Sequence, residues 1–192
     1  NYNGSLSGRD GSLSGSGVQE LEAAIRRSEA CGIAGRGADV RLIEALCPEP
    51  RERIQYRYMV GNAAQDEYPS SLGIVREACD GDFSELLSVE EAYQKEEVLS
   101  RIHDFSSSVC SASVRITLAR YKALVLESGG RIIARAQING TGRHYEQIGG
   151  VYVRPEFRGR GAGRAVTAAL ARDIRNRGKI PALFVKTSNS AA

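Results

Sequence analysis

The chain has 192 residues, enough for one ordinary domain or for one domain and part of another. Its composition is that of a globular protein, with 42% hydrophobic and 26% charged residues. A net charge of +3 is too small to indicate a nucleic-acid binder by itself, and no apolar run approaches the roughly 18 residues that a membrane-spanning helix needs. We therefore expect neither a nucleic acid nor a membrane as a partner.

The cysteines are widely spaced and form no C-x-x-C pair: Cys31, Cys47, Cys79 and Cys110. This spacing argues against a zinc site and against a disulfide framework. We expect reduced thiols and no bound metal. No signal peptide is recognisable, so we expect a cytoplasmic protein.

The first part of the chain divides into a tail and an extension. Residues 1–17 are rich in Gly and Ser and contain Gly-Ser-Leu-Ser-Gly twice, which predicts a tail or linker with too little apolar surface to fold. Residues 18–71 are expected to be an N-terminal extension or partial domain. Within them the patterns predict helices over 18–36 and 39–46 and a strand over 53–60.

Residues 72–192 have a more regular pattern. Asp82 is a candidate N-cap, and Glu85 three residues later completes the pattern of a capping box. The predicted order is β-α-α-β-β-β-α-β, an α/β (α+β) fold with a mixed central sheet flanked by helices. The predicted elements are strand 73–78, helix 83–98, helix 102–121, strand 123–127, strand 131–138, strand 145–153, helix 163–177 and strand 180–187.

The Arg/Gly loop, Arg158-Gly159-Arg160-Gly161-Ala162-Gly163, lies between a predicted strand and an Ala-rich helix. Glycines permit positive φ and leave backbone amides accessible, and a helix N-terminus attracts anions. Arg164 adds a further positive charge. The loop lacks the G-K-[ST] of a nucleotide P-loop and does not fit G-x-G-x-x-G, because position 164 is Arg. It therefore predicts a pyrophosphate site of another kind, the alternative being a solvated connecting loop.

Residues 151–163 resemble the acetyl-CoA signature of the GNAT N-acetyltransferase superfamily, whose core pattern is [QR]-x-x-G-x-[GA]. The segment 183–192 is similar to that family's next strand and the start of its next helix. The resemblance covers about residues 72–192. The chain is also similar to bacterial proteins of this superfamily in which a YxKEEVL-like segment, here 93–99, precedes a QIGGVY-like strand, behind a small divergent N-terminal domain.

The resemblance implies an acetyl-CoA-dependent N-acetyltransferase. Backbone groups of Val151 and Val153, within the strand Val151-Tyr152-Val153, would pair with the pantetheine arm, and the Val151 amide would polarise the thioester. Asn189 would contact the cofactor where the central strands separate. The pyrophosphate would be held by the amides of the loop and helix start, namely Arg158, Gly159, Arg160, Gly161, Ala162, Gly163 and Arg164.

The reaction needs a base to deprotonate the amine, and family members often use a Glu on the strand before the loop. Glu146 is our candidate, and simple alternation along the strand places it on one face with Ile148, Gly150 and Tyr152. The alternative is a solvated carboxylate at the end of a strand. His144 and Tyr145 are weaker candidates, and His103 is expected to be a surface or packing histidine.

The family's usual general acid is a Tyr on the helix that follows Asn189, so we expect it beyond Ala192. For the same reason the last helix and strands of the family fold are expected to be missing, which would leave a sheet edge that a second copy could cover in a homodimer. The acidic pair Glu96-Glu97 has two interpretations. The two carboxylates are solvated at the end of a helix, or they attract a cationic amine.

The amine acceptor is not determined by the sequence. A non-catalytic module that binds acyl-CoA is the main alternative to an enzyme. The arginines of the last predicted helix, residues 163–177, offer a weaker alternative in nucleic-acid binding, but Asp173 interrupts them and no aromatic platform accompanies them.

Overall fold

The structure, a computed structural model, describes residues 15–27, 32–47, 49–50, 52–61, 71–98 and 105–189. The chain forms two compact units, Asn1–Ile54 and Gln55–Ala192. The first unit contains helices α1 (Gly15–Arg27) and α2 (Gly37–Glu44).

The first predicted helix is placed incorrectly at both ends. It begins inside the predicted tail, at Gly15, and residues 32–36 are not helical. Gly32 and Gly35 account for the break, because glycine is unfavourable in a helix interior. The second predicted helix is confirmed to within two residues. The rest of the predicted tail, residues 1–14, lies outside the described residues.

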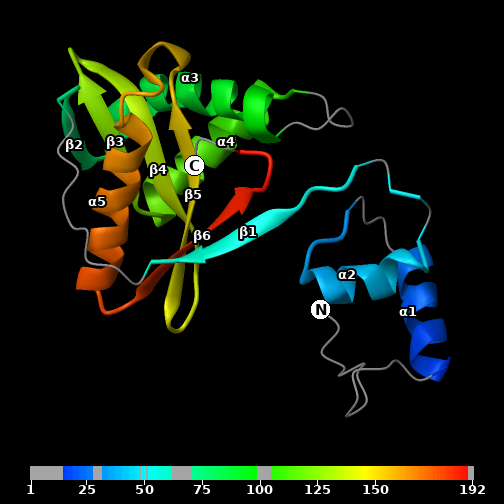
Figure 1. Cartoon of the computed structure of the whole chain (residues 1–192). Helices are drawn as coiled ribbons and strands as arrows, with labels where there is room; N and C mark the ends of the chain where they lie inside the picture. Colours follow the sequence, from blue (N-terminus) through cyan, green and yellow to red (C-terminus); the bar gives the residue numbers. More distant parts are fainter. Residues whose placement is uncertain are drawn as a thin grey trace. The chain divides into compact units, whose positions relative to one another are not determined.

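The second unit is built on a six-stranded sheet with the order β1-β6-β5-β4-β3-β2 (Figure 1). Neighbouring strands are antiparallel except for β5 and β6, which are parallel. A parallel pair needs a crossover connection, and helix α5 supplies it. The strands are β1 (Tyr56–Val60), β2 (Ile74–Glu77), β3 (Ala123–Ser128), β4 (Arg131–Thr141), β5 (Tyr145–Val153) and β6 (Ile180–Lys186).

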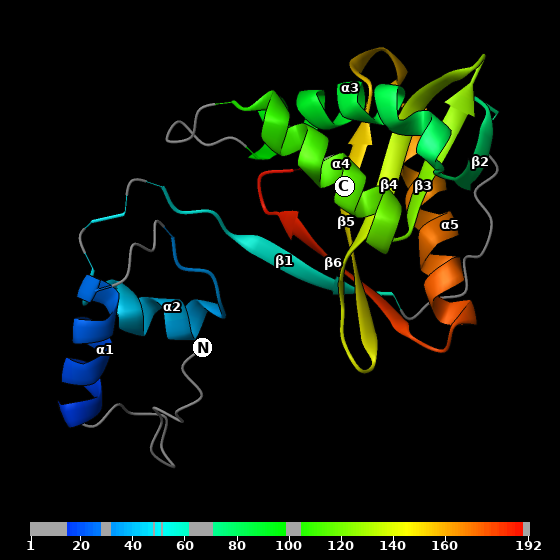
Figure 2. The ribbon, with the colours of Figure 1, turned by 180° about the vertical axis from the view of Figure 1, so that it is seen from behind.

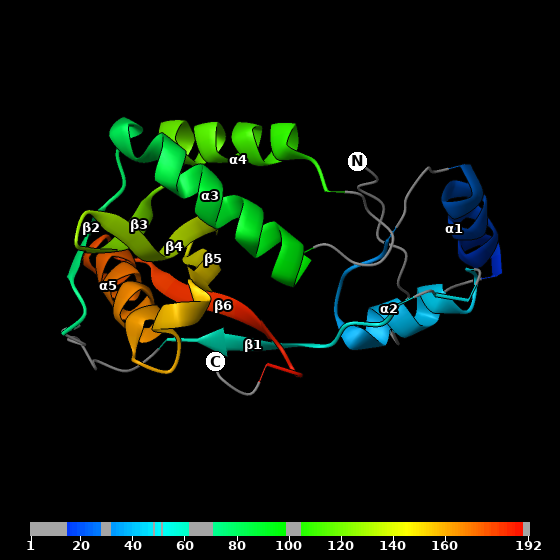
Figure 3. The ribbon, with the colours of Figure 1, turned by 90° about the horizontal axis from the view of Figure 1, so that it is seen from above.

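Helices cover both faces of this sheet, so the unit has three layers (Figure 3). Helices α3 (Phe83–Tyr93) and α4 (Ser107–Arg120) lie on one face, and α5 (Ala162–Asn176) lies on the other. The π-helical turn η2 (Gln94–Val98) continues α3. The core on the α5 face includes Leu124, Leu126, Ile133, Ile148, Val166, Leu170 and Ile174. The core on the α3 face includes Leu86, Val89, Val114, Val125, Ile132 and Tyr152.

The predicted fold class is confirmed, and the predicted elements of residues 72–192 occur in the predicted order. The sheet also contains one strand that lies outside residues 72–192. The strand predicted in the N-terminal extension pairs with β6 as β1, from Tyr56 opposite Lys186 to Val60 opposite Ala182. It therefore belongs to the sheet, and the compact unit begins at Gln55.

Two predicted boundaries are wrong. Phe105 and Ser106 are not helical, and α4 begins at Ser107 because the Ser106 hydroxyl caps it by accepting from the Val109 amide. The predicted turn at 139–142 begins later, because β4 continues to Thr141 in pairing with β5. His103 lies outside the described residues.

The predicted capping box at Asp82 and Glu85 does not form. Asp82 occupies the N-cap position of α3 without bonding to that helix. Its carboxylate instead accepts from the amide of Cys79, the residue before the short turn η1 (Asp80–Asp82), at 2.8 Å and pairs with Arg76 at 2.7 Å. Glu85 pairs with Arg154 at 3.2 Å. Asp82 therefore pairs with the guanidinium of Arg76, in β2, and does not cap the amides of α3 as predicted.

Candidate functional site

The parallel strands β5 and β6 pair over only part of their length. Their register runs from Tyr145 opposite Ile180 to Ile148 opposite Leu183. Beyond this point β5 remains paired with β4 as far as Val153, and β6 remains paired with β1 as far as Lys186. The two strands are therefore held by their outer neighbours while their facing edges separate. Backbone groups on such edges can hydrogen-bond to a ligand as an added strand would.

A β-bulge interrupts β5 at this separation. Gly150 has φ 56°, and the register between β4 and β5 shifts between the pairs Gln137–Gly149 and Arg135–Tyr152. A side chain at 150 would lie 3.1 Å from the Gln137 side chain, in a backbone conformation that suits only glycine. The sequence therefore places the bulge where the two strands separate.

Because of the bulge, Glu146 does not share a face of the sheet with Tyr152, as simple alternation along the strand had predicted. Ile148 packs in the core on the α5 side, whereas Tyr152 packs in the core on the α3 side. Val151 and Val153 face the start of α5, because a side chain added at Gly163 would meet both of them. The extra residue of the bulge reverses the alternation, so Glu146 and Tyr152 lie on opposite faces rather than on one.

The Arg/Gly loop has the geometry of an anion site. Gly159 has φ 69° and Gly161, the N-cap of α5, has φ 85°. A Cβ added at either glycine would meet no described atom within 4 Å, so both face open space. The first-turn amides of α5 follow directly and have no partner within the helix. Exposed backbone and helix dipole together favour a phosphate group here.

The start of α5 lies close against β5. A Cβ at Gly163 would be 3.2 Å from Cγ2 of Val153 and 4.0 Å from Cγ1 of Val151. The glycine thus allows the first helical turn to approach the end of the strand. The structure brings together the predicted cofactor residues Val151, Tyr152, Val153 and the run 158–164, at the carboxyl end of β5.

Asn189 follows the carboxyl end of β6, where its amide donates to the Lys186 carbonyl at 2.9 Å. It lies beyond the separated segment of that strand. The predicted site residues thus come from three places in the sequence: the end of β5, the Arg/Gly loop and the turn after β6. Their proposed contacts with a cofactor stay predictions.

Glu146 lies at the other end of β5. It lies seven positions before Val153, roughly 23 Å along an extended strand. Its side chain is 4% exposed and forms ion pairs with Arg177 at 2.7 Å and with Lys179 at 3.3 Å. These cations follow α5 and explain why the carboxylate is tolerated inside the protein. Its role as a general base stays a prediction.

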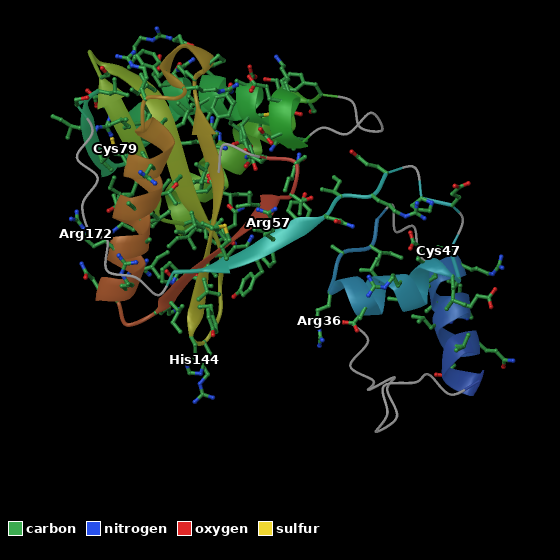
Figure 4. All side chains as sticks on the ribbon, in the orientation of Figure 1. Arg36, Cys47, Arg57, Cys79, His144 and Arg172 are labelled. Atoms are coloured by element: carbon green, nitrogen blue, oxygen red, sulfur yellow. The ribbon has the colours of Figure 1, made fainter. Side chains whose placement is uncertain are left out.

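The two weaker base candidates lie at the same end of β5. Figure 4 shows His144 at the tip of the β4–β5 hairpin. Tyr145, the first residue of β5, is 44% exposed. The loop with the positive-φ glycines lies at the opposite end of the strand (Figure 1).

Sequence reasoning missed a cluster around Glu96. The Tyr152 hydroxyl donates to Glu96 Oε1 at 2.8 Å, and Arg158 Nη2 donates to Glu96 Oε2 at 2.5 Å. The hydrogen bond from Arg158, followed by that from Tyr152, holds the pKa of Glu96 below its ordinary value. Glu96 is exposed, as one of the two interpretations expected, but it is also bonded to two side chains of the β5 end. The segment 93–99 that carries the resemblance was the available signal.

A buried charge pair was also missed. Arg135 of β4 and Glu90 of α3 are each 2% exposed and form an ion pair. Glu90 also accepts from Gln94 at 2.7 Å. The signals were present in the sequence, because Glu90 lies one turn after Leu86 and Arg135 interrupts an apolar strand.

Within the described ranges, no helix has the length and apolar character that crossing a membrane requires. The same residues contain no group of three or more His, Cys, Asp or Glu side chains suited to a metal ion.

Comparisons with known proteins show which folds this chain is similar to. Residues 140–192 match the family model described as FR47-like protein. No curated protein sequence matches the chain. Among solved structures, a putative acetyltransferase of the GNAT family from Novosphingobium aromaticivorans is 18% identical, with a TM-score of 0.52 over 75% of this chain and 59% of that one.

Two further structures are similar. A predicted acetyltransferase from Clostridium acetobutylicum, solved with acetyl-CoA, is 19% identical with a TM-score of 0.50, over 61% of this chain and 83% of that one. A ribosomal-protein-alanine N-acetyltransferase from Brucella melitensis is 21% identical with a TM-score of 0.51, over 62% and 77%.

These likenesses show that the chain has the fold of the GNAT acetyltransferases, and they confirm the predicted resemblance at that level. The chain spans 59% of the length of the first of these structures.

Proposed function

We propose that the protein is an acetyl-CoA-dependent N-acetyltransferase that acts on a primary amine. The observation that carries the proposal is the separation of β5 and β6 next to the glycine turns of the Arg/Gly loop. A pantetheine arm needs exposed strand backbone, and a pyrophosphate needs backbone amides at a helix start. The proposal is supported by the nearness of the free edge of β5 to the glycine turns that precede α5.

In this proposal, amides of Gly159 to Arg164 hold the pyrophosphate and the backbone of Val151 to Val153 holds the pantetheine arm. The predicted contribution of the Arg158 amide is not kept, because that amide donates to the Pro155 carbonyl at 3.2 Å. Both glycine turns of the loop face open space, which fits a bulky anion at this position. Asn189 adds a contact from the end of β6. No metal is required, because the amides and arginines supply the positive potential.

The chemistry proposed is direct transfer. The nitrogen of a neutral amine attacks the thioester carbon, the carbon–sulfur bond breaks, and CoA leaves as the thiolate. The nitrogen loses one proton as the amide forms, and the thiolate takes up a proton to give the free thiol, so the protons balance. An amide N–H near Val151 would stabilise the charge that develops on the carbonyl oxygen. Glu146 is the proposed base. The ion pairs with Arg177 and Lys179 also give this carboxylate a purely structural explanation.

A second candidate function is a non-catalytic module that binds acyl-CoA. The position of Glu146 favours it, because this carboxylate lies at the end of β5 away from the loop. Such a module would keep the cofactor site without a base near the thioester. For either function we propose a cytoplasmic location.

Calorimetry with CoA and with the variant Gly161→Glu tests the cofactor site. The new carboxylate would project into the anion site and repel the pyrophosphate, so we expect CoA affinity to fall more than tenfold. Gly178→Glu is the matched control. Gly178 also has a positive φ, 76°, and faces open space, but it follows the other end of α5, about 22 Å away. Unchanged affinity in Gly161→Glu would refute the proposed site.

Thiol release from acetyl-CoA with a panel of amines separates the two functions. An enzyme releases CoA with at least one acceptor. Tight CoA binding without thiol release across polyamines, amino acids, aminoglycosides and peptides would favour the binding module.

A further inference from the structure

Arg158, the first residue of the Arg/Gly loop, is engaged by this chain's own groups. Its Nε donates to the Val153 carbonyl at 3.0 Å and its Nη2 donates to Glu96 at 2.5 Å. The guanidinium also lies over the Tyr152 ring, 5.3 Å from the centroid. The side chain thus folds back across the end of β5.

The turn that carries Glu96 also reaches β6. Lys186 Nζ donates to the Glu97 carbonyl at 2.6 Å and lies 3.7 Å from the Glu97 carboxylate. Glu96 contacts the β5 side and Glu97 contacts the β6 side. The turn η2 therefore connects the ends of the two strands that separate, at the edge where the cofactor is proposed to bind.

A cofactor pyrophosphate and the Glu96 carboxylate compete for the same guanidinium. Both are anions, and Arg158 precedes the glycines that form the proposed phosphate site. The Arg158 and Glu96 side chains are 47% and 38% exposed, so water weakens their attraction and the pair can exchange partners. Tyr152 would remain as a donor to Glu96 after the exchange.

We propose that Glu96 is a latch that holds Arg158 away from the phosphate site and releases it to the pyrophosphate when the cofactor binds. The inference rests on the proposed function, because it requires CoA at this site. It makes Glu96 a positioning residue. It also links the turn η2 to occupation of the cofactor site.

The test is CoA binding to the full chain by calorimetry. Glu96→Gln keeps an oxygen that accepts from Tyr152 but removes the charge that holds Arg158. An exposed ion pair contributes little, so we expect CoA to bind about two- to fivefold more tightly to this variant. Glu97→Gln is the matched control, since it removes the same charge one residue later, and we expect its affinity to stay within about twofold of the parent.

A double-mutant cycle identifies Arg158 as the partner. In a chain carrying Arg158→Ala, the further change Glu96→Gln should leave CoA affinity unaltered, because no guanidinium remains to be released. A merely structural role for Glu96 would not depend on Arg158 in this way.

Three results would overturn the latch. They are unchanged or weaker CoA binding in Glu96→Gln, equal tightening in Glu97→Gln, and tightening that persists without Arg158. If the parent chain itself fails to bind CoA, the proposed function falls and the latch falls with it.

Discussion

Arg135 and Glu90 form a buried ion pair directly beneath the bulge in β5. A side chain at Gly150 would lie 3.5 Å from Arg135 Nη2. Arg135 also donates to Gln137 at 3.2 Å and lies over the Tyr93 ring, 5.1 Å from the centroid. The face of the bulge opposite α5 is therefore supported by a charged network. Figure 2 shows the sheet from this side, on which α3 and α4 lie.

We expect Glu90→Ala to destabilise the protein strongly, because it leaves the Arg135 guanidinium buried without its counterion. Breaking such a pair by removing one partner costs about 3–5 kcal/mol of unfolding free energy. Urea unfolding measures it.

Glu91→Ala is the control for this prediction. Glu91 is half-buried and accepts from Ser107, and we expect its loss to cost about 1 kcal/mol. The double variant Glu90→Leu with Arg135→Met should recover much of the stability. Equal stability of Glu90→Ala and the parent would show that the pair has no structural role.

The order of strands and helices in residues 72–192 could be predicted from local patterns. Apolar residues recur at every second position in a half-buried strand and at every third or fourth position in a helix, and the two kinds of segment follow each other along the chain. The loop between β5 and α5 was also predictable, since strand end, glycines and helix start are contiguous in sequence. These features depend on neighbours along the chain. Their positions in the structure therefore follow from the sequence without knowledge of the tertiary fold.

Contacts between distant residues were not predictable in the same way. Glu96 and Arg158 are 62 residues apart, and no local pattern pairs them. The bulge at Gly150 reversed the face assigned to Glu146, because strand alternation assumes an uninterrupted register. The strand β1 was assigned to an extension, since its pairing with β6 joins segments more than 100 residues apart in the sequence, such as Tyr56 and Lys186.

Asp82 should make the stability of the protein depend on acid pH. Its hydrogen bond with Arg76 lowers the pKa of Asp82 to about 2. The unfolded chain has an ordinary Asp pKa near 3.9 and binds the proton more readily, so the stabilisation is present above about pH 4 and is lost as the pH falls towards 2.

The variant Asp82→Asn tests this dependence. We expect it to lose about 1–2 kcal/mol at pH 7, a figure reduced because Arg76 is partly exposed. Urea unfolding at pH 7 and pH 2.5 should show the difference between variant and parent shrinking in acid. A difference that is the same at both pH values would contradict the assignment.

Glu146→Gln separates the structural role of this carboxylate from the catalytic one. We expect unfolding free energy to fall by about 1–3 kcal/mol, since a buried amide cannot neutralise Arg177 and Lys179. CoA affinity should be unchanged, because Glu146 lies at the other end of β5 from the loop.

With an active amine, the pH profile of kcat decides whether Glu146 is the base. The acidic limb of the parent profile should disappear in Glu146→Gln if this carboxylate takes the proton. An unaltered limb would leave Glu146 with its structural role alone.

The contact between Gly163 and Val153 predicts a graded response to side-chain size at the start of α5. In Gly163→Ala, the added Cβ would lie 3.2 Å from Val153 Cγ2, which requires a small shift. The better helix propensity of alanine, about 0.5–1 kcal/mol, offsets that shift, so stability should stay near that of the parent.

Gly163→Leu cannot be accommodated in the same way. Its side chain meets both Val151 and Val153 and must move the first turn of α5 away from β5. The amides proposed to hold the pyrophosphate move with it, so we expect CoA affinity to fall about tenfold, equivalent to 1.4 kcal/mol. Asn176→Leu, an exposed position at the far end of α5, is the control and should bind CoA as the parent does. Parent-like affinity in a folded Gly163→Leu protein would separate the helix start from cofactor binding.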